Sequence, residues 1–127
     1  MSDQEDVRRC ALTLPGVTEE AHGYKVCGKL FAHDWPERVD PKKPKVPNPD
    51  VLVVRVAGEG DKQALLASDP RKFFTTDHYN GYPSVLVRLA EVDQQELAEL
   101  IIDSWRSRAP ANLVRDYDLS AGPHEPC

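Results

Sequence analysis

The spacing of apolar residues predicts a helix at each end of the chain. Between Val7 and Leu14 the apolar residues fall at i, i+3, i+4 and i+7, which places them on one face of a short amphipathic helix. The second helix begins after Asp93, a good N-cap, and Glu96 three residues later completes a capping-box pattern. This helix is expected to end at Ala109, with a short further turn after it.

Shorter stretches between these helices predict strands. Two segments flank Gly28 as in a tight hairpin, with the glycine at a turn position that needs an unusual φ. Val51–Val56 and Val85–Leu89 are typical of strands because they are rich in β-branched residues, and Phe73–Thr76 is a further candidate. A short helix is predicted over Asp61–Ser68.

Two segments are expected to lie outside these elements. Asp34–Asp50 contains five prolines and little apolar content, which predicts a long, mobile surface loop between two strands. The last ten residues, Asp118–Cys127, are expected to form a disordered tail. We therefore expect a single folded domain over residues 1–117, with this loop inside it and the tail after it.

The order of elements indicates the fold class. A helix is followed by two or three strands, a helix, one or two strands and a helix. Short hairpins favour an antiparallel sheet, and amphipathic helices need a common face to cover. We therefore predict an α+β, two-layer sandwich with the helices on one face of the sheet.

Length and composition narrow the class of protein. A chain of 127 residues is the size of one domain. No apolar run approaches the roughly 20 residues that a membrane-spanning helix needs, and the acidic segment Met1–Asp6 lacks the features of a secretory signal. We expect a cytoplasmic monomer with no membrane partner.

The cysteines and histidines do not indicate a metal or a cofactor. Cys10, Cys27 and Cys127 make an odd number with no Cys-x-x-Cys pair, which argues against a disulfide framework and a structural zinc site. The histidines beside the predicted hairpin match no ligand spacing. No metal and no cofactor is predicted.

Two stretches of the chain carry a family pattern. The first consists of Leu12–Val17 and Tyr24–Ala32; the second is His78–Leu89, followed by Trp105-Arg106 and Ala109-Pro110. Together they cover nearly the whole predicted domain. On these motifs the chain resembles the MmcQ/YjbR family.

The resemblance implies a frataxin-like (CyaY-like) fold, with a curved antiparallel sheet and helices on one face. It also implies a DNA-binding, regulatory protein, through the likeness of this fold to a double-wing transcription-factor domain. It brings no enzymatic activity and no catalytic residues. Two features depart from the family pattern: the Asp34–Asp50 segment is longer than the usual connection, and Ala111-Asn112 stand where relatives often carry basic residues.

Charge gives a mixed indication about a nucleic-acid partner. The net charge of −5 argues mildly against a polyanion, yet residues 25–45 hold six basic residues against three acidic ones. Side-chain alternation along the predicted strands places Lys25, Arg55 and Arg88 on the face away from the helices, as a cationic stripe that is expected to contact phosphates or an acidic small molecule. The alternative is that an uncovered sheet face simply needs polar residues.

A basic run in the proline-rich segment is a second candidate for nucleic-acid binding. Lys42, Lys43 and Lys45 are predicted to act as an electrostatic arm. The alternative is an ordinary solvated loop.

The segment before the last predicted strand suggests a different function. His78, Tyr79 and Tyr82 surround Asn80-Gly81 and are predicted to border a cleft for a small molecule or a protein partner. Equally, Asn-Gly is a turn signal beside which tyrosines pack well. No nucleophile–base pair is recognisable, so the sequence does not indicate an enzyme.

Overall fold

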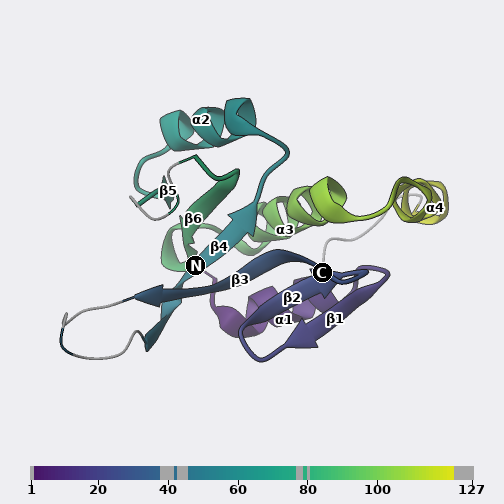
Figure 1. Cartoon of the computed structure of the whole chain (residues 1–127), viewed down its shortest axis with the longest axis horizontal. Coiled ribbons are helices and arrows are strands. Elements are labelled where there is room, and N and C mark those ends of the chain that lie inside the picture. The colour runs from purple at the N-terminus through teal and green to yellow at the C-terminus, as the bar shows by residue number, and fades with distance from the viewer. Residues whose placement is uncertain (1, 38–41, 43–45, 77–78, 80, 122–127) are drawn as a thin grey trace.

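The computed structural model describes residues 2–37, 42, 46–76, 79 and 81–121 (Figure 1). Within these residues six strands form one sheet in the order β1-β2-β3-β4-β6-β5, and every neighbouring pair is antiparallel. The strands are β1 (Val17–Glu20), β2 (Gly23–Val26), β3 (Lys29–Glu37), β4 (Val46–Arg55), β5 (Phe73–Phe74) and β6 (Ser84–Arg88).

Helices accompany this sheet and complete the predicted architecture. They are α1 (Gln4–Leu12), α2 (Glu59–Ser68), the short 3-10 helix η2 (Leu89–Glu91), α3 (Gln94–Arg108) and α4 (Ala111–Ala121). The predicted α+β fold with an antiparallel sheet is confirmed. None of the described helices is both long and apolar enough to cross a membrane.

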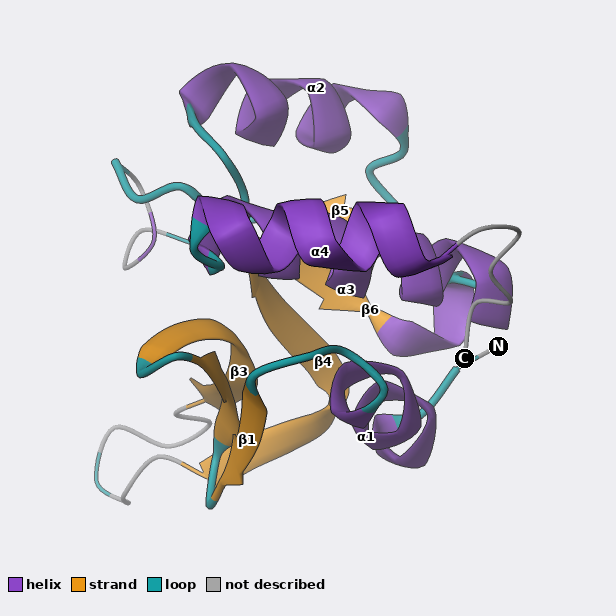
Figure 2. Cartoon of the chain, turned by 90° about the vertical axis from the view of Figure 1, so that its right-hand side faces the viewer, coloured by secondary structure: helices purple, strands orange, loops and turns teal. Residues whose placement is uncertain are grey.

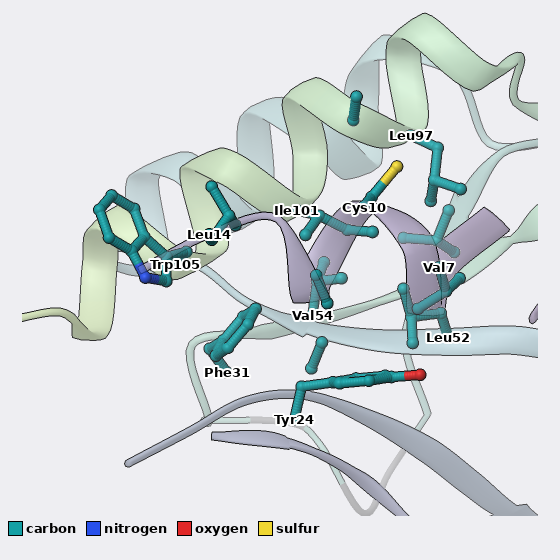
Figure 3. Close-up of a cluster of buried hydrophobic side chains, with 14 of the residues drawn as sticks. Val7, Cys10, Leu14, Tyr24, Phe31, Leu52, Val54, Leu97, Ile101 and Trp105 are labelled. Atoms are coloured by element: carbon teal, nitrogen blue, oxygen red, sulfur yellow. The ribbon is translucent and has the colours of Figure 1, made fainter. Parts of the chain in front are cut away.

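The main core lies between the sheet and the pair α1 and α3, which pack against one of its faces (Figure 2). Leu97, Ile101 and Trp105 of α3 are fully buried against strand side chains, as the helical period predicts (Figure 3). Full burial of such a side chain contributes about 1.5–3 kcal/mol. The Trp105 indole Nε1 also donates to the Pro15 carbonyl at 3.0 Å, so its polar atom is satisfied.

Local signals set the start of α3. The Asp93 carboxylate accepts a hydrogen bond from the Glu96 backbone N–H at 2.7 Å, which confirms the predicted N-cap. The Glu96 side chain does not complete the capping box but pairs with Lys72 Nζ at 2.9 Å. A tertiary ion pair therefore replaces the local contact that the sequence pattern suggested.

The hairpin between β2 and β3 has a two-residue turn. Val26 pairs with Lys29, and both turn residues have positive φ: 50° at Cys27 and 84° at Gly28. This is the combination of a type I′ turn, whose twist matches that of the flanking strands. The predicted hairpin and the unusual φ at its glycine are confirmed.

The segment expected to be a long loop is partly a β-hairpin. β3 continues to Glu37 and β4 begins at Val46, so residues 35–37 pair with 46–48 as a two-stranded ribbon, named here the ribbon. In Figure 1 the ribbon extends beyond the neighbouring strands. Among the described residues its outer edges are unpaired, because β2 pairs with β3 only up to His33 and β6 pairs with β4 only from Val51. Proline is tolerated on such free edges, which explains how a proline-rich segment forms strands.

The segment expected to be a disordered tail begins inside α4, which runs to Ala121. Arg106 of α3 makes a two-pronged ion pair with Asp118, at 2.5 and 2.9 Å, and this pair holds the helix end. The rest of the predicted tail, residues 122–127, lies outside the described residues.

Candidate nucleic-acid interface

The second face of the sheet carries its own apolar cluster. Val51, Val53 and Leu86 are buried there together with Tyr79, from the connection between β5 and β6. Burial raises the pKa of the Tyr79 phenol. The centre of the face that the sequence suggested to be open is therefore covered.

A buried lysine fixes this covering segment. Lys62 of α2 is only 1% exposed, and its Nζ donates to the carbonyl oxygens of Tyr79 at 2.7 Å and Tyr82 at 2.8 Å. These bonds replace the water that the ammonium loses on burial. Sequence reasoning missed this residue, because a lysine between Asp61 and Gln63 reads as an ordinary exposed helical position.

Beside the covered centre, an aromatic pair and an arginine meet on the same face. The rings of Trp35 and Phe74 are in an edge-on contact, with centroids 5.6 Å apart, and both pack on the apolar cluster. The exposed Arg88 guanidinium lies 4.1 Å from the centroid of the Phe74 ring, a cation–π distance. We call these three residues the aromatic surface.

Hydrogen bonds orient the guanidinium of the aromatic surface. Arg88 Nη1 donates to the backbone carbonyls of Pro70 at 3.1 Å and Arg71 at 3.4 Å. No other ion-pair or hydrogen-bond contact of this side chain is present within the described part of the chain. The remaining N–H donors therefore stay available to a ligand.

The aromatic surface lies at the root of the ribbon. Trp35 follows the last β3 residues that pair with β2, and Arg88 pairs with Val51, where the ribbon joins the sheet. Lys42 is exposed at the tip. The other two predicted arm residues, Lys43 and Lys45, lie outside the described residues.

The three cations of the predicted stripe are not brought together. Arg55 pairs with Ser84 and Arg88 pairs with Val51, so the two arginines are four residues apart on the sheet, about 13 Å along the strands. Lys25 is on β2, separated from β4 by β3, and its Nζ lies 4.0 Å from a Glu20 carboxylate oxygen. Arg88 alone among the three joins the aromatic surface.

The predicted cleft residues also separate. Tyr79 is buried, with its ring 6.3 Å from that of His33, whereas Tyr82 is 58% exposed. His78 lies outside the described residues. Within the described residues no group of three His, Cys, Asp or Glu side chains is placed to hold a metal ion.

Comparisons with known proteins place the chain in a family. The sequence model of the YjbR family matches residues 12–107. The chain is 40% identical over 129 residues to the uncharacterised proteins Rv2570 of Mycobacterium tuberculosis and Mb2600 of Mycobacterium bovis, covering 96% of this chain and 100% of each relative. No solved structure matches. The chain belongs to the YjbR family.

Proposed function

We propose that this protein binds nucleic acid through the aromatic surface and the basic tip of the ribbon. The observation that carries the proposal is the oriented, exposed Arg88 guanidinium 4.1 Å from the centroid of the Phe74 ring, which also contacts Trp35 at the root of the ribbon. In the sequence, Lys42, Lys43 and Lys45 lie between the two strands of the ribbon. Arginine combines phosphate binding with stacking on planar groups, which lysine does not. The family resemblance to DNA-binding proteins supports the same assignment.

Each part of the surface has a separate task in this proposal. The half-buried Trp35 offers a ring for base stacking, which contributes about 1–3 kcal/mol per base in single-strand binding. Lys42, Lys43 and Lys45 contact phosphates along the strand. Single-stranded DNA is the preferred ligand, because its bases are free to stack.

Part of the acidic net charge lies away from the aromatic surface, whereas Asp34 and Glu37 of β3 and Asp50 of β4 are close to it along the chain. Glu5 belongs to α1, and Glu99 and Asp103 belong to α3. Both helices cover the opposite face of the sheet from the aromatic surface. At physiological salt, charges more than about 8 Å away are strongly screened.

Fluorescence anisotropy with a labelled single strand and a labelled duplex tests the proposal. At about 50 mM salt we expect binding, tighter for the single strand. Raising the salt to about 200 mM should weaken it on the order of 50-fold if about four phosphates are contacted. No binding to either DNA at low salt would contradict the proposal.

Variants locate the interface. Arg88→Gln and the triple change Lys42→Gln, Lys43→Gln, Lys45→Gln should each weaken binding about tenfold or more and lower the salt dependence. Arg115→Gln is the matched control, an exposed arginine on α4. Lys25→Gln and Arg55→Gln test the stripe that the sequence suggested. Wild-type affinity of Arg88→Gln would place any DNA contact elsewhere.

A further inference from the structure

A cavity separate from the aromatic surface lies between the end of β4, α2 and α3. Its volume is about 460 Å³, within the range of small-molecule sites. Leu65 of α2 and Leu100 of α3 are among its apolar walls, together with Val56 after β4. Arg55 and Asp103 bring charge to it.

Arg55 forms no ion pair within the part of the chain that the structure describes. Burial lowers the pKa of its guanidinium, and the positive charge of Arg108 lowers it further. Within the described part of the chain no carboxylate forms an ion pair with Arg55, and the buried Nε of Arg108 has no hydrogen-bond partner. Arg55 and Arg108 are thus neighbouring guanidinium groups without an ion-pair partner among the described residues, which favours the binding of an anion beside Arg55.

Unlike Arg55, three other arginines of the chain form ion pairs with carboxylates. Arg8 pairs with Glu19 at 3.0 Å, and Arg9 pairs with Asp6 at 2.5 Å. Arg106, which also lines the cavity, is neutralised by its two-pronged contact with Asp118. Arg55 is thus a cavity-lining cation left to interact with a ligand.

The acidic groups of the cavity limit the charge that a ligand can carry. Asp61 of α2 and Asp103 of α3 both line it, and the negative charge of Asp61 acts on Asp103. A doubly charged phosphate would meet more repulsion from these groups than a singly charged carboxylate. A planar carboxylate also matches the fork of the arginine donors.

We propose that this cavity binds a small monocarboxylic acid, with the carboxylate on Arg55 and an apolar body against Leu65 and Leu100. The site shares no residue with the aromatic surface. The two proposals are therefore tested at different residues: the nucleic-acid proposal at Arg88 and the lysines between the ribbon strands, the carboxylate proposal at Arg55 and Ala64.

The test is a titration of the whole protein with benzoate, followed by ¹H–¹⁵N correlation NMR. Benzoate should cause saturable shifts in the amides of residues 55–57, 61–65 and 100–107. Neutral benzamide, which has the same ring, should bind at least about tenfold more weakly, since it cannot make charge-assisted hydrogen bonds to the guanidinium. The absence of saturable shifts at these residues up to about 20 mM benzoate, a concentration that detects even millimolar affinity, would overturn the proposal.

Two variants test separately the contribution of the Arg55 charge and that of the space in the cavity. Arg55→Met should lower the affinity for benzoate about tenfold or more, whereas Arg115→Met, far along α4, should leave it unchanged. Ala64→Phe adds a ring at the exposed cavity rim without changing any charge and should also reduce binding at least about tenfold. Wild-type affinity in either Arg55→Met or Ala64→Phe would contradict the site. If Arg55→Met does not fold, the comparison with benzamide still decides the role of charge.

Discussion

At the scale of residues, Lys62 stabilises the second face of the sheet, because it holds the segment around Tyr79 and Tyr82 in place. Replacing it with methionine keeps much of the apolar stem but leaves the carbonyls of Tyr79 and Tyr82 without their donor. We expect Lys62→Met to lower the free energy of unfolding by about 2–3 kcal/mol, measured by urea denaturation. Lys72→Met is the control: it removes a partly exposed ion pair with Glu96, and such pairs are screened by solvent, so the loss of stability should be clearly smaller than in Lys62→Met. Equal losses in both variants would contradict this role of Lys62.

Two aspartates should shift stability with pH in opposite directions. Burial raises the pKa of Asp103 in the folded protein, so its ionised form destabilises the fold at pH 7. Asp103→Asn should be more stable than wild type there, by no more than about 0.5 kcal/mol for so exposed a group. The difference should vanish as the pH falls below the unfolded-state pKa, near 3.9.

Asp118→Asn is the control, because its effect on the free energy of unfolding should have the opposite sign. The hydrogen bond from Arg106 lowers the pKa of Asp118, so its ionised form stabilises the fold above the unfolded-state pKa. Asp118→Asn should be less stable than wild type at pH 7 and lose this difference on acidification. Thermal denaturation of both variants, from about pH 7 down to below the unfolded-state pKa near 3.9, measures the two signs and the loss of each difference. The same sign in both would contradict the account.

At this scale the sequence predicted local features and missed tertiary ones. The Asp93 cap and the turn at Gly28 were predictable because each depends on neighbours within three residues. The bond of Lys62 to Tyr79 spans 17 positions, and no sequence pattern of Lys62 marks it as buried.

At the scale of elements, α4 packs on the core through the buried Tyr117 and the partly buried Leu113 and Val114, beside the ion pair of Asp118 with Arg106. The Tyr117 ring is buried and meets the Trp105 ring edge-on, with centroids 5.0 Å apart. Tyr117→Ala should lower the free energy of unfolding by about 3 kcal/mol and speed hydrogen exchange throughout α4. Leu119→Ala, at a position 79% exposed, should change neither measurement appreciably. Unchanged exchange of α4 in Tyr117→Ala would show that this contact does not hold the helix.

Two parts of the sheet, β1 and the ribbon, could not be predicted from the sequence. β1 exposes Thr18, Glu19 and Glu20, so it lacks the alternation of a half-buried strand. The ribbon contains prolines, which argue against a strand until its unpaired edges are known. The strongly apolar strands β4 and β6 were predictable because burial on both faces dictates their composition.

At the scale of the whole molecule, the fold class followed from the order of elements, but the candidate site did not. Alternation assigns Arg55 and Arg88 to one face, yet only strand register shows that they lie four residues apart. The aromatic surface joins Trp35, Phe74 and Arg88 from three strands, and no local pattern links them. The sequence therefore identified Arg88 as a candidate, but only the strand order shows that Phe74 and Trp35 lie beside it.

Tryptophan fluorescence tests the proposed interface most directly. The chain has two tryptophans: Trp105 is fully buried, whereas the half-buried Trp35 belongs to the aromatic surface. Titration with a short thymidine oligonucleotide at low salt should quench the emission with the same midpoint as the anisotropy change, because a base stacks on Trp35. Trp35→Phe should abolish the quenching. DNA binding that leaves the wild-type emission unchanged would contradict the proposed interface.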